Sequence, residues 1–220
     1  MRLTALAIIP HSLSIFAAAV LVSGLYDRLT LRNIARLGFV VVAAGLMLLA
    51  VMIRNEWDTL PVILALTLIG LGQGALMTVL FNALAAASLE ELAGDVASPR
   101  GTTNNLAGAV GTAIAGTLPI GVLSASIMSD LVDNPVIPME LKAQVDPDTI
   151  TFVGNELLQE ALERTGATHD QVAEAVHMNT QARLRSLTIC LIALTGLALV
   201  AIFPAGALPG CDGEGAGRRR

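Results

Sequence analysis

Two polar side chains stand inside long apolar runs of this 220-residue sequence and could do chemistry there. His11 lies in the run from Leu3 to Tyr26, and Gln73 lies in the run from Leu60 to Ala87. Where an apolar run of this length crosses a membrane, its polar groups normally face the interior of a helix bundle or a water-filled cavity. Two interpretations stay open for each residue: it lines a substrate cavity, or it makes a purely structural hydrogen bond to a neighbouring helix.

A short basic turn separates the first two apolar runs. It carries Asp27 and the arginines Arg28, Arg32 and Arg36. Short loops rich in arginine stay on the cytoplasmic side of a membrane, so this turn predicts the orientation of the chain. The alternative is a solvated charge cluster with no further role.

Other kinds of chemistry find little support in the residues. No cluster of His, Asp and Glu and no serine beside a base lies within an apolar run, so an enzyme is the weakest of the function classes. We expect no cofactor and no metal site, because Cys190 lies in an apolar run whereas Cys211 lies in a polar tail. We also expect no nucleic-acid partner, since no basic face is interleaved with aromatic residues.

The composition indicates a membrane protein. The chain is 54% hydrophobic and 14% charged, whereas soluble domains are usually about 25% charged. Five apolar runs are long enough to cross a bilayer. We therefore predict an all-α membrane protein with four transmembrane helices in residues 1–128, an acidic loop outside the membrane in 129–182, a fifth transmembrane helix in 183–204 and a disordered cytoplasmic tail in 205–220.

Small residues mark the helices that we expect to pack closely, because glycine lets a neighbouring backbone approach. One group lies in the third run and another in the fourth; the members are Gly70, Gly72 and Gly74, then Gly108, Gly111 and Gly116. The second group repeats with other small residues around nearly the whole helix. This predicts a crowded fourth helix.

The acidic loop should contain short helices. Glu156 to Arg164 has an apolar face, and Thr168 to Gln171 has the pattern of a capping box, in which the first and last side chains bond each other's backbone N–H. The helix that follows could run directly into the fifth span, where we interpret Arg183 and Arg185 as groups that extend towards the outer interface. Both the basic turn and the C-terminal tail, with its terminal arginines, then face the cytoplasm.

These features, in this order, resemble the major facilitator superfamily, and more closely its fourteen-span drug:proton antiporter branch. Leu25, Asp27, Arg28 and Arg32 match the conserved cytoplasmic loop pattern of that family, with Thr30 in place of its second glycine. The further segments that match lie in order along nearly the whole chain: Gly70 to Gly74, Ala93 to Ser98, Gly101 with Asn104 and Asn105, Gly108 to Gly111, and Ala175 to Asn179.

The resemblance implies that the five spans form most of the second half of such a bundle, in the plasma or inner membrane. It also implies that Asp27, Arg28 and Arg32 act in conformational gating, and that Gln73 and His11 face a small organic substrate. Five spans with a cytoplasmic C-terminus put the amino terminus outside, so we expect a C-terminal portion of a transporter that is inactive without its missing N-terminal half. The alternative is a non-transporting membrane subunit that pairs with a separately encoded half.

Overall fold

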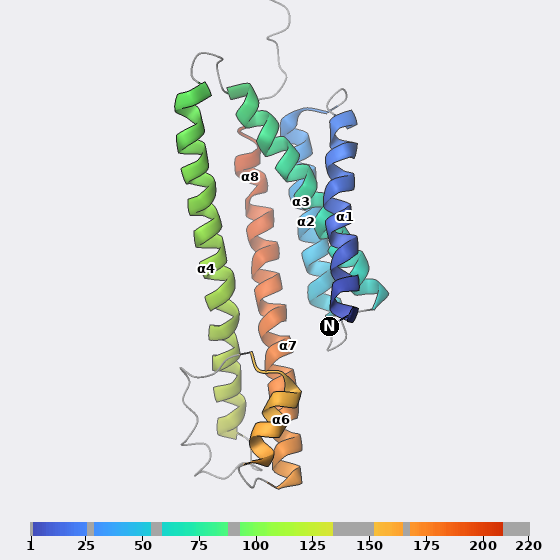
Figure 1. Ribbon diagram of the computed structural model, residues 1–220, viewed down its shortest axis with the longest axis vertical. Helices are drawn as coiled ribbons and strands as arrows, with labels where there is room; N and C mark the ends of the chain where they lie inside the picture. Colours follow the sequence, from blue (N-terminus) through green and yellow to red (C-terminus); the bar gives the residue numbers. More distant parts are fainter. Residues whose placement is uncertain are drawn as a thin grey trace, which may run out of the picture. The chain divides into compact units, whose positions relative to one another are not determined.

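The structure is a computed structural model of the 220-residue chain, and it describes residues 2–25, 29–53, 59–87, 93–133, 152–164 and 168–208 (Figure 1). Every regular element in these ranges is a helix, and no strand occurs in them, which confirms the predicted all-α class. The helices are α1 (Arg2–Leu25), α2 (Leu31–Met52), α3 (Leu60–Ala87), α4 (Ala93–Asp133), α6 (Asn155–Glu163), α7 (His169–Val200) and α8 (Ile202–Ala205).

The described part of the chain contains 4 helical stretches long and apolar enough to cross a membrane: Leu31–Met52, Leu60–Ala83, Asn105–Val132 and His169–Ala205. They make the chain a multi-pass membrane protein, as the sequence indicated. The first of the five predicted spans corresponds to α1, whose described side chains form a shorter apolar helix over Ile9–Leu25.

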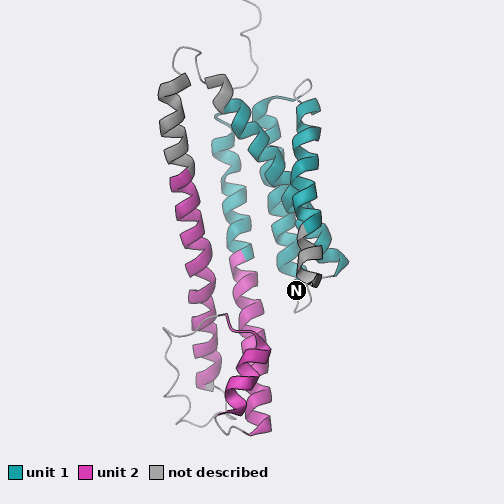
Figure 2. Cartoon of the chain, in the orientation of Figure 1, with its two compact units in different colours: residues 1–103, 191–220 teal, residues 104–190 magenta. Residues whose placement is uncertain are grey.

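The helices form two compact units, residues 1–103 with 191–220 and residues 104–190 (Figure 2). In the first unit α3 packs against both α1 and α2. Its core contains Val22 of α1, Ile34 and Ala35 of α2, Val79 of α3 and Ala205 of α8, each less than 9% exposed. The apolar faces of these helices therefore meet one another near one end of α3.

In the second unit, α4 lies beside the first half of α7. Ser186 of α7 is completely buried, and its hydroxyl donates a hydrogen bond to the carbonyl oxygen of Pro119 in α4 at 2.6 Å. Leu123, one turn after Pro119, is also fully buried. A small hydroxyl residue and a tightly packed leucine thus fix the contact between the two helices.

Helix α6 is attached to α7 by amide groups. The side-chain amide of Asn179 donates to Asn155 Oδ1 at 2.9 Å and to the carbonyl oxygen of Val153 at 3.2 Å. Asn155 in turn donates to the hydroxyl of Thr180 at 2.8 Å. The predicted helix at Glu156 to Arg164 is confirmed, and these bonds attach its first residue to α7.

The capping box at the start of α7 is also confirmed. The backbone N–H of Thr168 donates to Gln171 Oε1 at 3.0 Å, and the N–H of Gln171 donates to Thr168 Oγ1 at 3.4 Å. Because these bonds satisfy the free donors of the first turn, the helix begins at His169 and continues without a break into the apolar run.

Two boundaries of the predicted segments differ in the structure. Helix α4 begins at Ala93 and continues past residue 128, where the fourth predicted span ends, to Asp133. Helix α7 covers residues 169–182 of the acidic loop and continues into the fifth span, as the sequence indicated it could. Residues 205–208, expected in the tail, are folded, and Ala205 is buried. The physical reason is that an apolar run marks what crosses the membrane, whereas a helix continues until its backbone hydrogen bonding ends.

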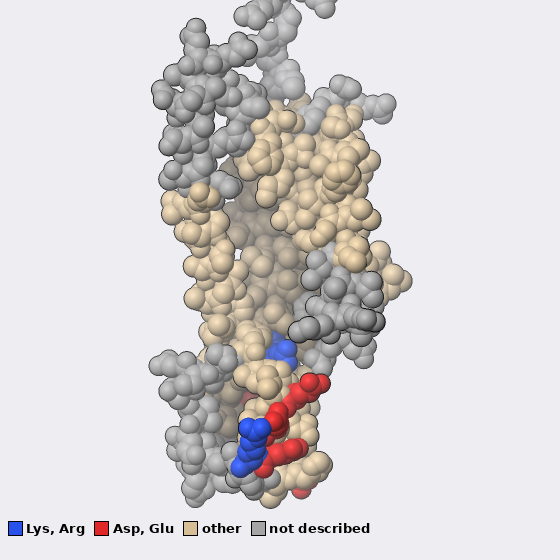
Figure 3. Space-filling model, in the orientation of Figure 1, with Lys and Arg blue, Asp and Glu red and all other residues tan. Residues whose placement is uncertain are grey.

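Charge on the visible face is concentrated in the second unit. Figure 3 shows the charged atoms over α6 and the adjoining part of α7, and the described atoms of the first unit are uncharged on this face. Helix α6 carries Glu156, Glu160 and Glu163, and Arg164 pairs with Glu160 on the exposed surface. This polar region corresponds to the acidic segment that the sequence placed outside the membrane.

Candidate functional site

His11 joins α1 to α3. Its ring nitrogen Nδ1 lies 3.1 Å from the carbonyl oxygen of Leu66, and because a carbonyl only accepts, Nδ1 is the donor. The imidazole is partly buried. One turn further along α1, the buried Ser14 donates its hydroxyl to the carbonyl oxygen of Pro10 at 2.5 Å. His11 therefore makes the hydrogen bond to a neighbouring helix that was one of its two interpretations.

The close approach of α1 to α3 depends on glycine at two positions of α3. A Cβ atom at Gly70 would lie 2.5 Å from the carbonyl oxygen of His11 and 3.2 Å from His11 Nδ1. A Cβ atom at Gly74 would overlap the carbonyl oxygen of Ile15 and lie 2.8 Å from the Cβ of Ala18. Gly70 is thus the residue that makes room for the histidine and its hydrogen bond.

Gly72 faces the other neighbour of α3. A Cβ atom there would lie 2.6 Å from Val42 Cγ2 and 2.7 Å from the carbonyl oxygen of Gly38, both in α2. The three glycines of the predicted Gly70, Gly72 and Gly74 group are all buried. Gly70 and Gly74 thus allow α1 to approach α3 closely, and Gly72 allows α2 to do so.

Gln73, the second predicted cavity residue, is exposed on α3. Met77 and Leu80, one and two turns further along, are 46% and 47% exposed. These positions share one helix face by their spacing of four and seven residues. The structure therefore gives His11 a partner inside the first unit, whereas it leaves Gln73 on an open apolar face.

The basic turn is represented by Arg32, because Asp27 and Arg28 lie outside the described residues. Helix α2 begins after Thr30, whose hydroxyl accepts from the backbone N–H of Asn33 at 3.3 Å. Arg32, in the first turn, donates through Nε and Nη2 to the carbonyl oxygen of Leu208, both at 3.2 Å. Sequence reasoning missed this contact, because its partner is a backbone atom 176 residues away.

A second arginine of α2 lies against the same C-terminal turn. A Cβ atom at Gly206 would lie 2.5 Å from Nη2 of Arg36. The last carbonyl groups of a helix lack intrahelical partners and carry partial negative charge, which favours cations. Both guanidinium groups thus lie against residues 206–208, just after α8, and Arg32 donates hydrogen bonds there.

The glycines of α4 have open surroundings. Among the described residues, no atom lies within 4 Å of a Cβ placed at Gly108, Gly111 or Gly116. Thr112 and Thr117 turn their hydroxyls back to their own helix, to the carbonyl oxygens of Gly108 and Ala113. The crowded packing predicted for this helix remains a prediction.

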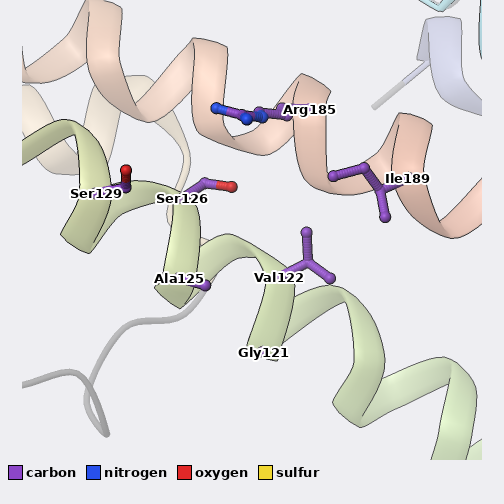
Figure 4. Close-up of a pocket in the computed structure, with 7 residues that line it drawn as sticks. All are labelled: Gly121, Val122, Ala125, Ser126, Ser129, Arg185 and Ile189. Carbon is purple, nitrogen blue, oxygen red and sulfur yellow. The ribbon is translucent and has the colours of Figure 1, made fainter.

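A pocket of about 340 Å³ lies between α4 and α7 within the second unit (Figure 4). Its polar groups are Ser126, Ser129 and Arg185, and its remaining lining residues are Gly121, Val122, Ala125 and Ile189. From the sequence, Arg185 was expected only as a group extending to the interface. The register of α4 against α7, which no local pattern encodes, brings the two serines to it.

In the part of the chain that the structure describes, no group of three or more His, Cys, Asp or Glu residues lies close enough together to hold a metal ion. Cys190 is buried and free.

Comparison with protein-family models, curated proteins and solved structures finds no match for this chain.

Proposed function

We propose that this multi-pass membrane protein belongs to the efflux type of secondary transporter and contributes helices to a bundle that moves amphiphilic organic compounds. The observation that carries the proposal is the exposure of Gln73 beside the apolar side chains of Met77 and Leu80 on α3. A primary amide facing lipid would leave two donors and a carbonyl without partners, which is costly in hydrocarbon. Gln73 therefore needs either a polar cavity or a further helix beside α3.

The resemblance to the fourteen-span drug:proton antiporters supports the cavity. In transporters built from repeats, substrate lies near the midplane between two halves of the bundle. The Gln73 face, with Met77 and Leu80 beside it, has the mixed character that an amphiphilic cation or neutral compound would meet. Alternating access requires both halves, so the helices described here would not transport alone. Coupling to protons is proposed from the resemblance.

The gating role of Asp27, Arg28 and Arg32 also belongs to this proposal. Arg32 contacts the backbone carbonyl of Leu208, just after α8, which is a contact that a conformational change could make and break. The second candidate function, a non-transporting subunit, is favoured by the same open face of α3. In that case Gln73 would bond to a partner helix instead of lining a cavity.

Thiol accessibility separates these candidates. In a chain with Cys190 and Cys211 replaced by serine, Gln73→Cys is treated in membranes with a water-soluble methanethiosulfonate. The control is Leu64→Cys on the same helix, where the native leucine is 51% exposed. Labelling at 73 without labelling at 64 is expected for a cavity, and protection at 73 by an amphiphilic substrate is expected for a transporter. Equal labelling at both positions, or none at 73, would contradict the cavity.

A flux assay tests the activity itself. The chain reconstituted alone in proteoliposomes with an imposed proton gradient should give no uphill movement of a fluorescent amphiphilic cation. Flux should appear when helices of a matching first half are added. Uphill flux by the chain alone would disprove the need for a second half, and thiol protection by a partner polypeptide without any flux would favour the subunit.

A further inference from the structure

The pocket between α4 and α7 combines one cation, two hydroxyl groups and an apolar border. In Figure 4, Ser126 and Ser129 on α4 point towards α7, and the guanidinium group of Arg185 lies along α7 above them. Ser126 is 7% exposed, whereas Arg185 is exposed. An anion entering this pocket would therefore meet a free guanidinium group first and a sheltered hydroxyl group behind it.

Arg185 has no recorded ion pair with a carboxylate in the part of the chain that the structure describes. The ion pair between Arg164 and Glu160 lies on α6 and does not involve Arg185. Asp130 follows Ser129 along α4 but is not among the lining residues. The pocket is thus a cationic site that can accept a negative ligand.

The pocket lies where both helices change from apolar to charged. After Arg185 the sequence carries no charged residue until Asp212, and before Asp130 it carries none as far back as Arg100. The apolar segment of α4 ends at Val132, only three residues beyond Ser129, or about 5 Å along a helix. Because hydrocarbon gives way to lipid headgroups at such a boundary, the pocket is at headgroup depth.

Apolar side chains continue from the pocket towards the hydrocarbon. Val122 and Ile189 line it on the side away from Ser129, and Ile189 is 42% exposed. Ile120, Leu118 and Ile114 continue along α4 and are 40%, 41% and 53% exposed. A ligand that has an anionic head and an acyl chain would match this order of surfaces.

We propose that this pocket binds the phosphate headgroup of an anionic phospholipid, with Arg185 as its counter-ion, Ser126 and Ser129 as hydrogen-bond donors, and Val122 and Ile189 against the first part of an acyl chain. Arginine suits this role because its planar guanidinium group donates two parallel hydrogen bonds to phosphate oxygens. The site is independent of Gln73 and of any transport activity.

Native mass spectrometry of the purified full chain tests the proposal. The chain in detergent is titrated with phosphatidylglycerol and, separately, with phosphatidylcholine of the same acyl chains. We expect tighter binding of phosphatidylglycerol, and about tenfold weaker binding of that lipid to Arg185→Gln, as expected for loss of a charge-assisted hydrogen bond. Phosphatidylcholine should lose less affinity in this variant, because its choline group already compensates the phosphate charge.

The matched control is Arg164→Gln, which removes the same charge from the exposed surface of α6 and should leave both lipids unaffected. Ile189→Trp, which fills the pocket without changing charge, should also weaken phosphatidylglycerol binding, so the test does not depend on one variant. Far-ultraviolet circular dichroism checks that each variant keeps its helix content.

Three results would overturn the proposal. Equal affinity for both lipids would show that the pocket does not select an anionic headgroup. An equal loss of binding in Arg164→Gln would show a general charge effect. Displacement of the lipid by millimolar inorganic phosphate would assign the site to free phosphate instead of a lipid.

Discussion

Arg32 and Leu208 join the beginning of α2 to the short segment after α8, through two hydrogen bonds of 3.2 Å from one guanidinium group to one carbonyl oxygen. The partners are 176 residues apart in sequence. Hydrogen bonds from a charged donor contribute about 1.5–3 kcal/mol, and less where water reaches them. This contact is consequently a main attachment of the segment after α7.

Replacing Arg32 should release that segment. In Arg32→Ala we expect amide hydrogen exchange at residues 205–208 to become about tenfold faster, because the carbonyl of Leu208 loses its donor. Arg32→Lys should retain part of the protection, since an ammonium group is a point donor without the guanidinium fork. Arg164→Ala is the matched loss of charge elsewhere. Unchanged exchange in Arg32→Ala would contradict the attachment.

Gly70→Ala should separate α1 from α3. The added methyl group would lie 2.5 Å from a backbone oxygen of α1, which cannot move aside as a side chain can. We expect a loss of about 1–3 kcal/mol in the free energy of unfolding, measured by denaturant titration in mixed micelles.

Gly108→Ala is the control for this variant, because it adds the same methyl group to a helix position with open surroundings. It should be neutral or stabilise slightly, since alanine is the better helix former. If Gly108→Ala were as damaging as Gly70→Ala in the isolated chain, the contact between α1 and α3 would not be the cause.

Ser186 should tolerate neither loss of its hydroxyl nor added volume. Ser186→Ala removes the hydrogen bond to Pro119 and should cost about 1 kcal/mol. Ser186→Val should cost more, about 1–3 kcal/mol, because the serine is completely buried between two helices. Thr112→Ala, which removes an exposed hydroxyl bonded within its own helix, serves as the comparison in the same thermal-shift measurement. Equal shifts for the two alanine variants would argue against this contact.

Asn179→Leu should free α6 from α7. The side chain is 6% exposed and donates to both Val153 and Asn155, so its loss leaves two acceptors without a donor. We expect limited proteolysis to cleave at residues 152–155 several times faster, while the apolar part of α7 stays protected. Gln159→Leu, which alters only an exposed bond to Glu163, should leave the cleavage rate unchanged.

The sequence was sufficient to predict features that depend on local pattern. Apolar runs identified the helices that can cross a membrane, and the capping box at Thr168 and Gln171 identified the start of α7. Helix bounds outside the apolar runs were missed, as at Asp133, because polar residues can continue a helix in water without leaving a hydrophobic signal.

The candidate sites show the same division. His11 and Gln73 were identified from their polarity in an apolar setting, but the distinction between them depends on tertiary contact: one bonds to Leu66 and the other is exposed. Arg185 with Ser126 and Ser129 depends on the register of two helices separated by residues 134–168. A local pattern contains no information on that register.

The contact between the start of α2 and the segment after α8 also has an electrostatic consequence. The first turn of α2 contains arginine and no acidic residue, so a cation stands at the positive pole of that helix, where it is electrostatically disfavoured. The carbonyl oxygen of Leu208, which accepts both hydrogen bonds from Arg32, compensates it. Shortening the protein to residue 204 would therefore leave the charge of Arg32 uncompensated at the N-terminus of α2. Its first effect would be weaker helix formation around Leu31.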